Sequence, residues 1–301
     1  MQIKSKNYPL ISIIMNCFNG ETYLAHAIKS VLLQTYRNFE VIFWDNQSSD
    51  NSAYIYKNFK DKRLRYYLAT EHTSLYRARN LAIKKARGKL IAFLDTDDIW
   101  LKDKLSSQIE KFKNKKVNLV YSNYYILNQV TGLKKIAHKN KLPEGVIYEQ
   151  LLKNYFLGIG TVLIKKDIFF KKKYFFNERF NIIGDFENFI RISKNNYFAC
   201  IQRPLLIYRI HKKSFSNKNY KMHVDELKFW VKKKYYLKKD LLFFVKQKIL
   251  YMEIILYIFN RKYIQSLKMI KKIYSKAKKV KLLIFLIIPN FIFKKIKSNF
   301  S

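Results

Sequence analysis

The chain has 301 residues, of which 60 are Lys or Arg and 21 are Asp or Glu, giving a formal net charge of +39. Apolar residues make up 49% of the sequence, which is enough to bury a core and excludes a wholly disordered protein. The two cysteines, Cys17 and Cys200, exclude a disulfide scaffold, fit a reducing compartment and cannot by themselves supply four zinc ligands.

The first 130 residues alternate between predicted strands and predicted helices. Apolar, β-branched runs predict strands at 10–16, 39–44, 64–68, 90–94 and 117–125. Helical spacing of apolar residues predicts helices at 21–33, 52–59, 74–86 and 101–112, the third ended by Gly88. This repetition implies an α/β fold with a mostly parallel sheet flanked by helices.

Acidic side chains follow two of these strands. One strand ends at Asp45, in the run DNQSSD, and another ends at Asp95, in the run DTDD. Because ligands bind beyond the carboxyl ends of parallel strands, both runs should lie at one functional edge. Carboxylates two residues apart can bind a hard cation such as Mg²⁺ or Mn²⁺. Solvated turns or helix caps remain an alternative interpretation of both runs.

Between residues 130 and 215 the patterns are mixed. Short strands are predicted at 160–164 and 204–208, and a helix at 184–193. Asp185 lies in the first turn of that helix, where a carboxylate suits the helix dipole or could act as a general base. Arg209 and His211 follow the last strand and could bind phosphate or a metal, although such a pair is usually a surface feature.

Residues 221–301 are strongly basic, with 21 Lys or Arg and 4 acids. Six apolar side chains in this tail fall at helical spacing among lysines: Tyr263, Ile264, Leu267, Ile270, Ile273 and Tyr274. The run at 282–293 is too short to span a membrane and contains a proline, and no signal peptide is visible. The tail is therefore either a helical extension packed on the main domain or an anchor on an anionic membrane surface.

The charge also suggests a nucleic-acid-binding protein. Lys, Ile, Asn, Tyr and Phe are all abundant, however, while Gly numbers 7 and Pro 4, as AT-rich coding would produce without selection for binding. Acidic strand ends repel phosphate unless a metal intervenes. We therefore expect no nucleic-acid partner, and a cytoplasmic protein that is peripheral on the inner face of the cell membrane.

Five segments, in order, resemble the family 2 inverting glycosyltransferases of the GT-A fold over roughly residues 8–215. They are PLISII before Phe18-Asn19, VLLQTYRNFEVI before DNQSSDNS, ARNLAI with ARG and IAFLDTDD, GDFE before Arg191, and YRIH ending at His211. The resemblance implies a Rossmann-type catalytic domain at 1–215 and a basic helical tail at 216–301. Within the domain, residues 1–130 would bind the nucleotide-sugar and 131–215 the acceptor.

The resemblance also implies a role for each matching residue. Six would bind the nucleotide-sugar: Phe18, Asn19, Asp45, Arg79, Asp95 and Arg209. Asp95, Asp97 and His211 would hold Mn²⁺ or Mg²⁺, assisted by Asp98. Asp185 would deprotonate the acceptor hydroxyl, so that a single displacement inverts the anomeric carbon.

The expected reaction transfers a sugar from a nucleoside-diphosphate donor, such as a UDP-sugar, to a glycan or lipid-linked acceptor. Its product would be lipopolysaccharide, capsule or another surface polysaccharide. The family usually has Glu-Asp where this chain has Gly184-Asp185, and Tyr-Asn where it has Phe18-Asn19. The first departure keeps open the alternative of a catalytically inactive glycosyltransferase-like partner in a synthase complex.

Overall fold

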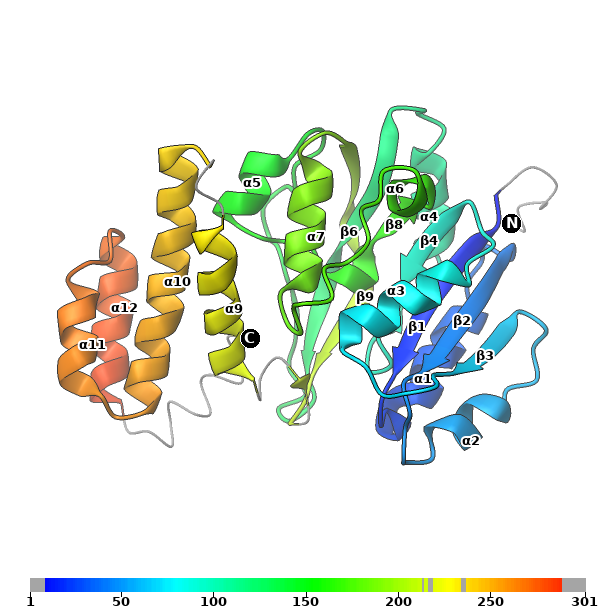
Figure 1. Ribbon diagram of the computed structural model, residues 1–301, viewed down its shortest axis with the longest axis horizontal. Coiled ribbons are helices and arrows are strands. Elements are labelled where there is room, and N and C mark those ends of the chain that lie inside the picture. Colours follow the sequence, from blue (N-terminus) through cyan, green and yellow to red (C-terminus); the bar gives the residue numbers. More distant parts are fainter. Residues whose placement is uncertain (1–8, 213, 216–218, 234–236, 289–301) are drawn as a thin grey trace. The chain divides into compact units, whose positions relative to one another are not determined.

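The computed structural model describes residues 9–212, 214–215, 219–233 and 237–288 (Figure 1). The chain forms two compact units, one of residues 1–151 and 155–209 and one of residues 152–154 and 210–301. The first unit is built on a β-sheet, and the described part of the second consists mainly of helices. Each unit has an apolar core of its own.

The sheet of the first unit has a parallel half and an antiparallel half. Its strand order is β3-β2-β1-β4-β8-β6-β9-β5, and β7 pairs with β6. Strands β1 to β4 are parallel to one another, whereas β8 runs antiparallel to both β4 and β6. The strands are β1 (Ile11–Cys17), β2 (Phe39–Asp45), β3 (Leu64–Leu68), β4 (Leu90–Phe93), β5 (Ile99–Trp100), β6 (Val117–Asn128), β7 (Lys134–Ile136), β8 (Leu163–Lys165) and β9 (Tyr197–Ile210).

Helices pack on the two faces of this sheet. Ile11, Ile13 and Met15 alternate along β1 and pack in one core with side chains of α1 and α4. Phe93 of β4 lies outside that core and contacts the ring of Phe176, on which Tyr76 of α3 stacks. The helices are α1 (Glu21–Leu32), α2 (Ser52–Lys57), α3 (Leu75–Lys84), α4 (Lys104–Lys111), α5 (Tyr148–Lys153), η1 (Ile159–Thr161, a 3₁₀ turn), α6 (Asp167–Phe170) and α7 (Gly184–Ser193). The predicted α/β class with flanking helices is confirmed.

Two local predictions were wrong. The segment expected to form a strand at 160–164 is a 3₁₀ turn followed by β8, which begins at Leu163. Gly88 does not end a helix, because α3 already ends at Lys84. Its role is a close approach to β1: a Cβ at position 88 would lie 2.6 Å from the backbone oxygen of Leu10.

A buried carboxylate ties the first strands together at their amino ends. Glu40 accepts hydrogen bonds from Ser12 Oγ at 2.7 Å, from the Arg87 backbone N–H at 2.8 Å and from Arg65 Nη1 at 2.8 Å. Burial by itself would raise the pKa of Glu40, but these donors outweigh it and hold the pKa below its ordinary value. Glu40 is therefore a charged structural residue.

The described part of the second unit contains four helices, three of which enclose a core. They are α9 (Tyr220–Lys232), α10 (Lys239–Phe259), α11 (Tyr263–Ile270) and α12 (Lys276–Ile287). The core consists of Ile254, Ile258, Ile270, Ile273, Leu282 and Phe285. Across the described residues, none of the helices is both long and apolar enough to cross a bilayer.

The apolar residues predicted for the tail divide between this core and the surface. Ile270 and Ile273 are buried, whereas Ile264 and Leu267 are 72% and 46% exposed. The predicted apolar run at 282–293 begins inside α12. Residues 289–301, which include Lys294, Lys295 and Lys297, lie outside the described residues.

Helix α12 carries two apolar stripes. Leu282 and Phe285 form the stripe that is buried in the core. The other stripe is solvent-exposed at spacings of three, four and seven residues. It consists of Val280, Leu283, Ile284 and Ile287.

Candidate active site

The parallel register brings the two acidic strand ends to one edge of the sheet. Asp45 is the last residue of β2 and pairs with Cys17, the last residue of β1. On the other side of β1, the Leu94 backbone N–H donates to the backbone oxygen of Ile14 at 3.0 Å, just before Asp95. Asp45 and Asp95 therefore flank the carboxyl end of β1, as predicted.

The carboxylate of Asp45 is buried and oriented by two donors. Its Oδ1 accepts the Ser48 backbone N–H at 2.8 Å, and its Oδ2 accepts the Tyr66 hydroxyl at 2.6 Å. Only 1% of Asp45 is exposed. A residue held in this way can present its remaining oxygen lone pairs to a donor group of a ligand.

An exposed aromatic pair lies next to Asp45. Phe18 follows the end of β1 and is 52% exposed, and its ring centroid lies 4.2 Å from that of His72. His72 is tied through Nδ1 to the backbone oxygen of Asn46 at 2.9 Å. Asn19 adopts a left-handed backbone (φ 54°), and its Oδ1 accepts the Ser49 backbone N–H at 2.8 Å. The loops after β1 and β2 are thus joined beside this exposed, tilted pair of rings.

Arg79 is a buried cation paired with Asp95. It is 2% exposed, and its Nη2 donates to Asp95 Oδ1 at 2.9 Å. The guanidinium lies over the rings of Tyr76, Phe93 and Phe176, at 5.4 to 5.9 Å from their centroids. The three rings and the ion pair hold the Arg79 guanidinium next to the Asp95 carboxylate.

Three carboxylates crowd the loop after β4. Asp98 is 2% exposed, and its Oδ1 accepts the Arg209 backbone N–H at 2.9 Å. Burial raises the pKa of Asp98 well above its usual range, and the charges of Asp97 and Asp95 raise it further. Burial also raises the pKa of Asp95, an effect that Arg79 opposes and Asp97 increases. Such crowding favours a bound cation.

Arg209 closes this loop from β9. Its Nε donates to the backbone oxygen of Asp97 at 2.8 Å, and its guanidinium lies 4.3 Å from the ring centroid of Tyr23. His211, two residues further on, belongs to the second unit, where its backbone N–H donates to Ser214 Oγ. Its metal-binding role therefore stays a prediction.

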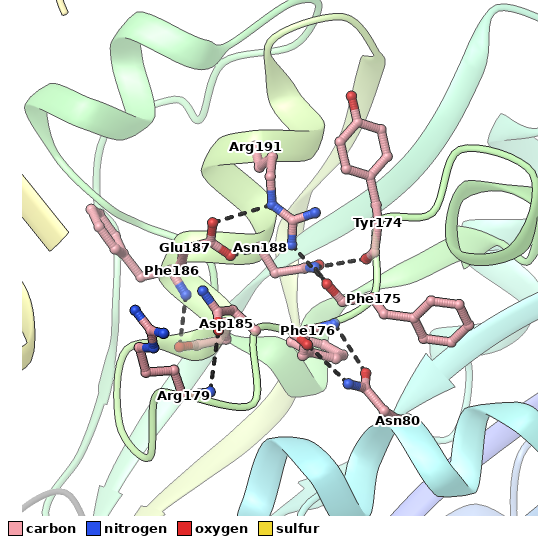
Figure 2. Close-up of polar contacts among 11 residues, drawn as sticks. Asn80, Tyr174, Phe175, Phe176, Arg179, Asp185, Phe186, Glu187, Asn188 and Arg191 are labelled. Carbon is pink, nitrogen blue, oxygen red and sulfur yellow. Dashed lines mark hydrogen bonds and ion pairs between the residues drawn. The ribbon is translucent and has the colours of Figure 1, made fainter. Parts of the chain in front are cut away.

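Asp185 is the second residue of α7, and that helix is anchored to the segment that precedes it (Figure 2). Asn188 Nδ2 donates to the backbone oxygen of Tyr174 at 2.8 Å, and Arg191 Nη2 donates to that of Phe175 at 2.7 Å. Asn80 of α3 exchanges two hydrogen bonds with the backbone of Phe176. The position of Asp185 thus depends on α3 as well as on its own helix.

The Asp185 carboxylate accepts two hydrogen bonds at the same oxygen. Oδ1 accepts the Phe186 backbone N–H at 2.8 Å and the Tyr76 hydroxyl at 3.2 Å. Burial raises the pKa of Asp185, while these donors and the Arg79 charge oppose that rise. An oriented carboxylate with a raised pKa has the properties of a general base.

The structure adds three residues that the sequence did not single out. Tyr66 orients Asp45, His72 contacts Phe18, and Tyr76 contacts Asp185. Tyr66 sits in a predicted strand and the other two in loop and helix segments, without any motif to mark them. Only their neighbours in space identify them.

Comparison with known proteins defines the class of the protein: it is a glycosyltransferase. The model for glycosyl transferase family 2 matches residues 12–199. The chain belongs to this family, and the resemblance found in the sequence is confirmed.

Named relatives and solved structures agree with this assignment. The chain is 33% identical over 214 residues to UDP-Glc:alpha-D-GlcNAc-diphosphoundecaprenol beta-1,3-glucosyltransferase WfgD of Escherichia coli, covering 70% of this chain and 81% of WfgD. It is 33% identical over 162 residues to the putative teichuronic acid biosynthesis glycosyltransferase TuaG of Bacillus subtilis, covering 53% of this chain and 63% of TuaG.

The fold is similar to that of S. aureus TarS 1-349. Against the crystal structure with UDP-GlcNAc the TM-score is 0.62 at 15% identity, covering 90% of this chain and 88% of TarS 1-349. Against the crystal structure with UDP it is 0.57 at 18% identity, covering 72% and 65%. The GT-A fold class is therefore confirmed.

Proposed function

We propose that the protein transfers a sugar, with inversion, from a UDP-sugar to a lipid-linked glycan acceptor during synthesis of a surface polysaccharide such as lipopolysaccharide or capsule. The name of WfgD includes a diphosphoundecaprenol-linked sugar and supports this acceptor class. The name of TuaG, which refers to teichuronic acid biosynthesis, supports a role in making a polymer. One observation carries the proposal: the first unit combines an oriented, partly buried carboxylate at Asp185 with the Arg79–Asp95 pair at the sheet edge.

The donor would lie across the edge formed by β1, β2 and β4. Asp45 would accept a hydrogen bond from the base, and the exposed Phe18 ring beside His72 offers a stacking surface for it. Asn19 would shape the loop that borders the ribose. Arg209 would attract the diphosphate, and Arg79 would hold Asp95 in place.

Asp95 and Asp97 suit a divalent cation such as Mn²⁺ or Mg²⁺ because both offer carboxylate oxygens two residues apart. Among the described residues no group of three His, Cys, Asp or Glu side chains forms a metal site, so diphosphate oxygens and water would complete the coordination. A bound cation supplies charge stabilisation for the leaving diphosphate.

Asp185 would remove the proton from the acceptor hydroxyl as that oxygen attacks the anomeric carbon. The bond to the diphosphate breaks on the opposite face, so the configuration inverts in one step and no covalent enzyme intermediate forms. Because Tyr76 and Phe186 hold Oδ1, the acceptor proton would transfer to Oδ2.

A donor screen with Mn²⁺ or Mg²⁺ tests this proposal by measuring nucleoside diphosphate release and product anomer. Asp185→Asn should lower turnover about 10²–10⁴-fold, the usual contribution of a general base. Asp97→Ala should abolish the stimulation of turnover by Mn²⁺ or Mg²⁺. Asp167→Asn is the matched control, because the Asp167 side chain is exposed and pairs with the exposed Lys171. A folded wild type without turnover on any donor would favour the inactive-partner alternative.

We also propose that the second unit holds the enzyme on the anionic inner face of the cell membrane. The exposed stripe of α12 ends in Ile287, which is 83% exposed, and Lys276 lies one helical turn before Val280 at its other end. Residues 221–301 combine 21 basic with 4 acidic side chains. That charge is complementary to anionic lipid and disfavours contact with a second copy of the same surface.

Vesicle sedimentation tests this contact. The wild type should bind phosphatidylglycerol vesicles but not phosphatidylcholine vesicles, and Ile284→Asp with Ile287→Asp should release it. Val130→Asp is the control, because Val130 is an exposed apolar residue too, at 60%, but belongs to the first unit. Unchanged binding of the double variant, or a dimer in solution that the double variant disrupts, would contradict the membrane contact.

A further inference from the structure

We propose that Tyr76 is a positioning residue for Asp185 and occupies the space that a side chain at position 184 would fill. The proposal rests on the assignment of Asp185 as the base. It also offers a physical reason for Gly184, the residue that departs from the family pattern.

The ring of Tyr76 excludes any side chain at position 184. A Cβ placed on Gly184 would lie 2.4 to 2.6 Å from three carbons of that ring, Cε2, Cδ2 and Cζ. The ring cannot easily move away, because it is 2% exposed and stacks on Phe176 with 5.5 Å between centroids. Glycine at 184 and tyrosine at 76 are therefore a matched pair.

The hydroxyl of Tyr76 links Asp185 to the backbone before α7. It lies 2.8 Å from the backbone oxygen of Ile182 and 3.2 Å from Asp185 Oδ1. Both are acceptors, so the single phenolic proton is shared between them while Asp185 is ionised. Once Asp185 has taken a proton at Oδ2, its Oδ1 becomes a weaker acceptor, and the Tyr76 hydroxyl can donate to the backbone oxygen of Ile182 instead. Tyr76 therefore favours the ionised form of the base and keeps an acceptor for its own proton when Asp185 is protonated.

Tyr76 is suited to remain a donor throughout the reaction. Burial raises its pKa well above the ordinary value for tyrosine, and the Asp185 charge adds to this effect. Other groups also act on Asp185: Arg79 favours its ionised form, and Asp95 disfavours it. The buried hydroxyl of Tyr155 and the hydroxyl of Tyr124 interact electrostatically with Asp185 as well. Of the three hydroxyls, that of Tyr76 lies within hydrogen-bond distance of the carboxylate, 3.2 Å from Oδ1.

Tyr76→Phe tests the hydroxyl without removing the ring. Loss of a donor to the ionised carboxylate raises the pKa of Asp185, so the acid limb of the kcat–pH profile should shift to higher pH, by about half to one unit. At neutral pH kcat should fall about tenfold, while KM for the donor stays within about twofold. Tyr36→Phe is the matched control, because Tyr36 is also buried and its hydroxyl donates to the backbone oxygen of Pro9.

The outcomes separate this inference from the proposed function. If Asp185→Asn is inactive but Tyr76→Phe keeps the wild-type kcat and pH profile, the positioning role is overturned and the base assignment stands. If folded Asp185→Asn is as active as wild type, the base assignment itself fails. A second experiment tests the steric pairing: Gly184→Glu should lose activity, and Gly184→Glu with Tyr76→Ala should regain part of it. A double variant no better than Gly184→Glu alone would contradict the pairing.

Discussion

The two units of the protein differ in where their charged side chains lie. The first unit buries several charged groups and gives them hydrogen-bond partners or a counter-charge, as at Glu40, Arg79 and Asp98. The second unit buries mainly apolar side chains in the core around Ile258 and leaves most of its lysines at the surface. A basic composition therefore says little by itself. The buried and paired charges are the informative ones, and they include structural residues such as Glu40 as well as residues of the candidate site.

One expected difference concerns the buried arginine. Arg79→Met should destabilise the first unit by about 1.5–3 kcal/mol in urea unfolding, because Asp95, whose side chain is 37% exposed, loses a charged hydrogen-bond donor. Arg77→Met is the control from the same helix, since Arg77 pairs with Glu71 at the surface and such pairs contribute at most about 1 kcal/mol. Equal effects of the two substitutions would show that burial of the Arg79 charge is not what stabilises this region.

The second unit should respond to loss of apolar volume instead. Ile258→Ala removes a side chain that is 1% exposed from the core of α10, α11 and α12, and should cost about 2–5 kcal/mol. Ile287→Ala removes an equal volume at an 83% exposed position and should change the unfolding free energy by no more than about 0.5 kcal/mol. Similar losses in both variants would mean that Ile287 is covered in solution.

The pH dependence of stability should separate the units further. Because the folded pKa of Glu40 lies below its ordinary value of 4.5, its stabilising effect is complete above that pH and is lost as the pH falls through the folded pKa. Glu40→Gln should therefore cost about 1–3 kcal/mol at pH 7, and the difference from wild type should shrink in acid. Glu71→Gln, at an exposed position, should show no such change. If Glu40→Gln lowers the free energy of unfolding equally in acid, the loss comes from altered packing and not from the charge of Glu40.

Much of the first unit could be predicted from its sequence because local pattern and tertiary structure agree there. The strand at 64–68 and the helix at 184–193 match β3 and α7 residue for residue, and the acidic strand ends meet at one edge. The motifs also identified Asp185 and Arg79 as candidates. The insertion of the antiparallel strand β8 between β4 and β6 was not predicted, since it depends on pairing with segments more than thirty residues away along the chain.

Contacts between distant segments account for the rest of the site. Tyr66, His72 and Tyr76 act through neighbours that local periodicity cannot reveal. Gly88 was assigned to a helix end because glycine is common there, whereas its neighbour is the backbone of β1. In the tail, helical spacing predicted the helix but not which apolar residues face the core. That choice is made by the partner helices, as the two stripes of α12 demonstrate.

The contact between Gly184 and Tyr76 also limits the order in which these positions can change during evolution. A lineage that carries Tyr76 cannot acquire a side chain at 184 first, because the new Cβ would overlap a ring that has no room to move. Tyr76 must be replaced by a smaller residue before Gly184 is replaced. That intermediate would lack both the Tyr76 hydroxyl and a side chain at position 184 to hold Asp185. The pair of Gly184 with Tyr76 is therefore separated by a less active intermediate from the pair of a larger residue at 184 with a smaller residue at 76. Descendants should retain whichever pair they inherited.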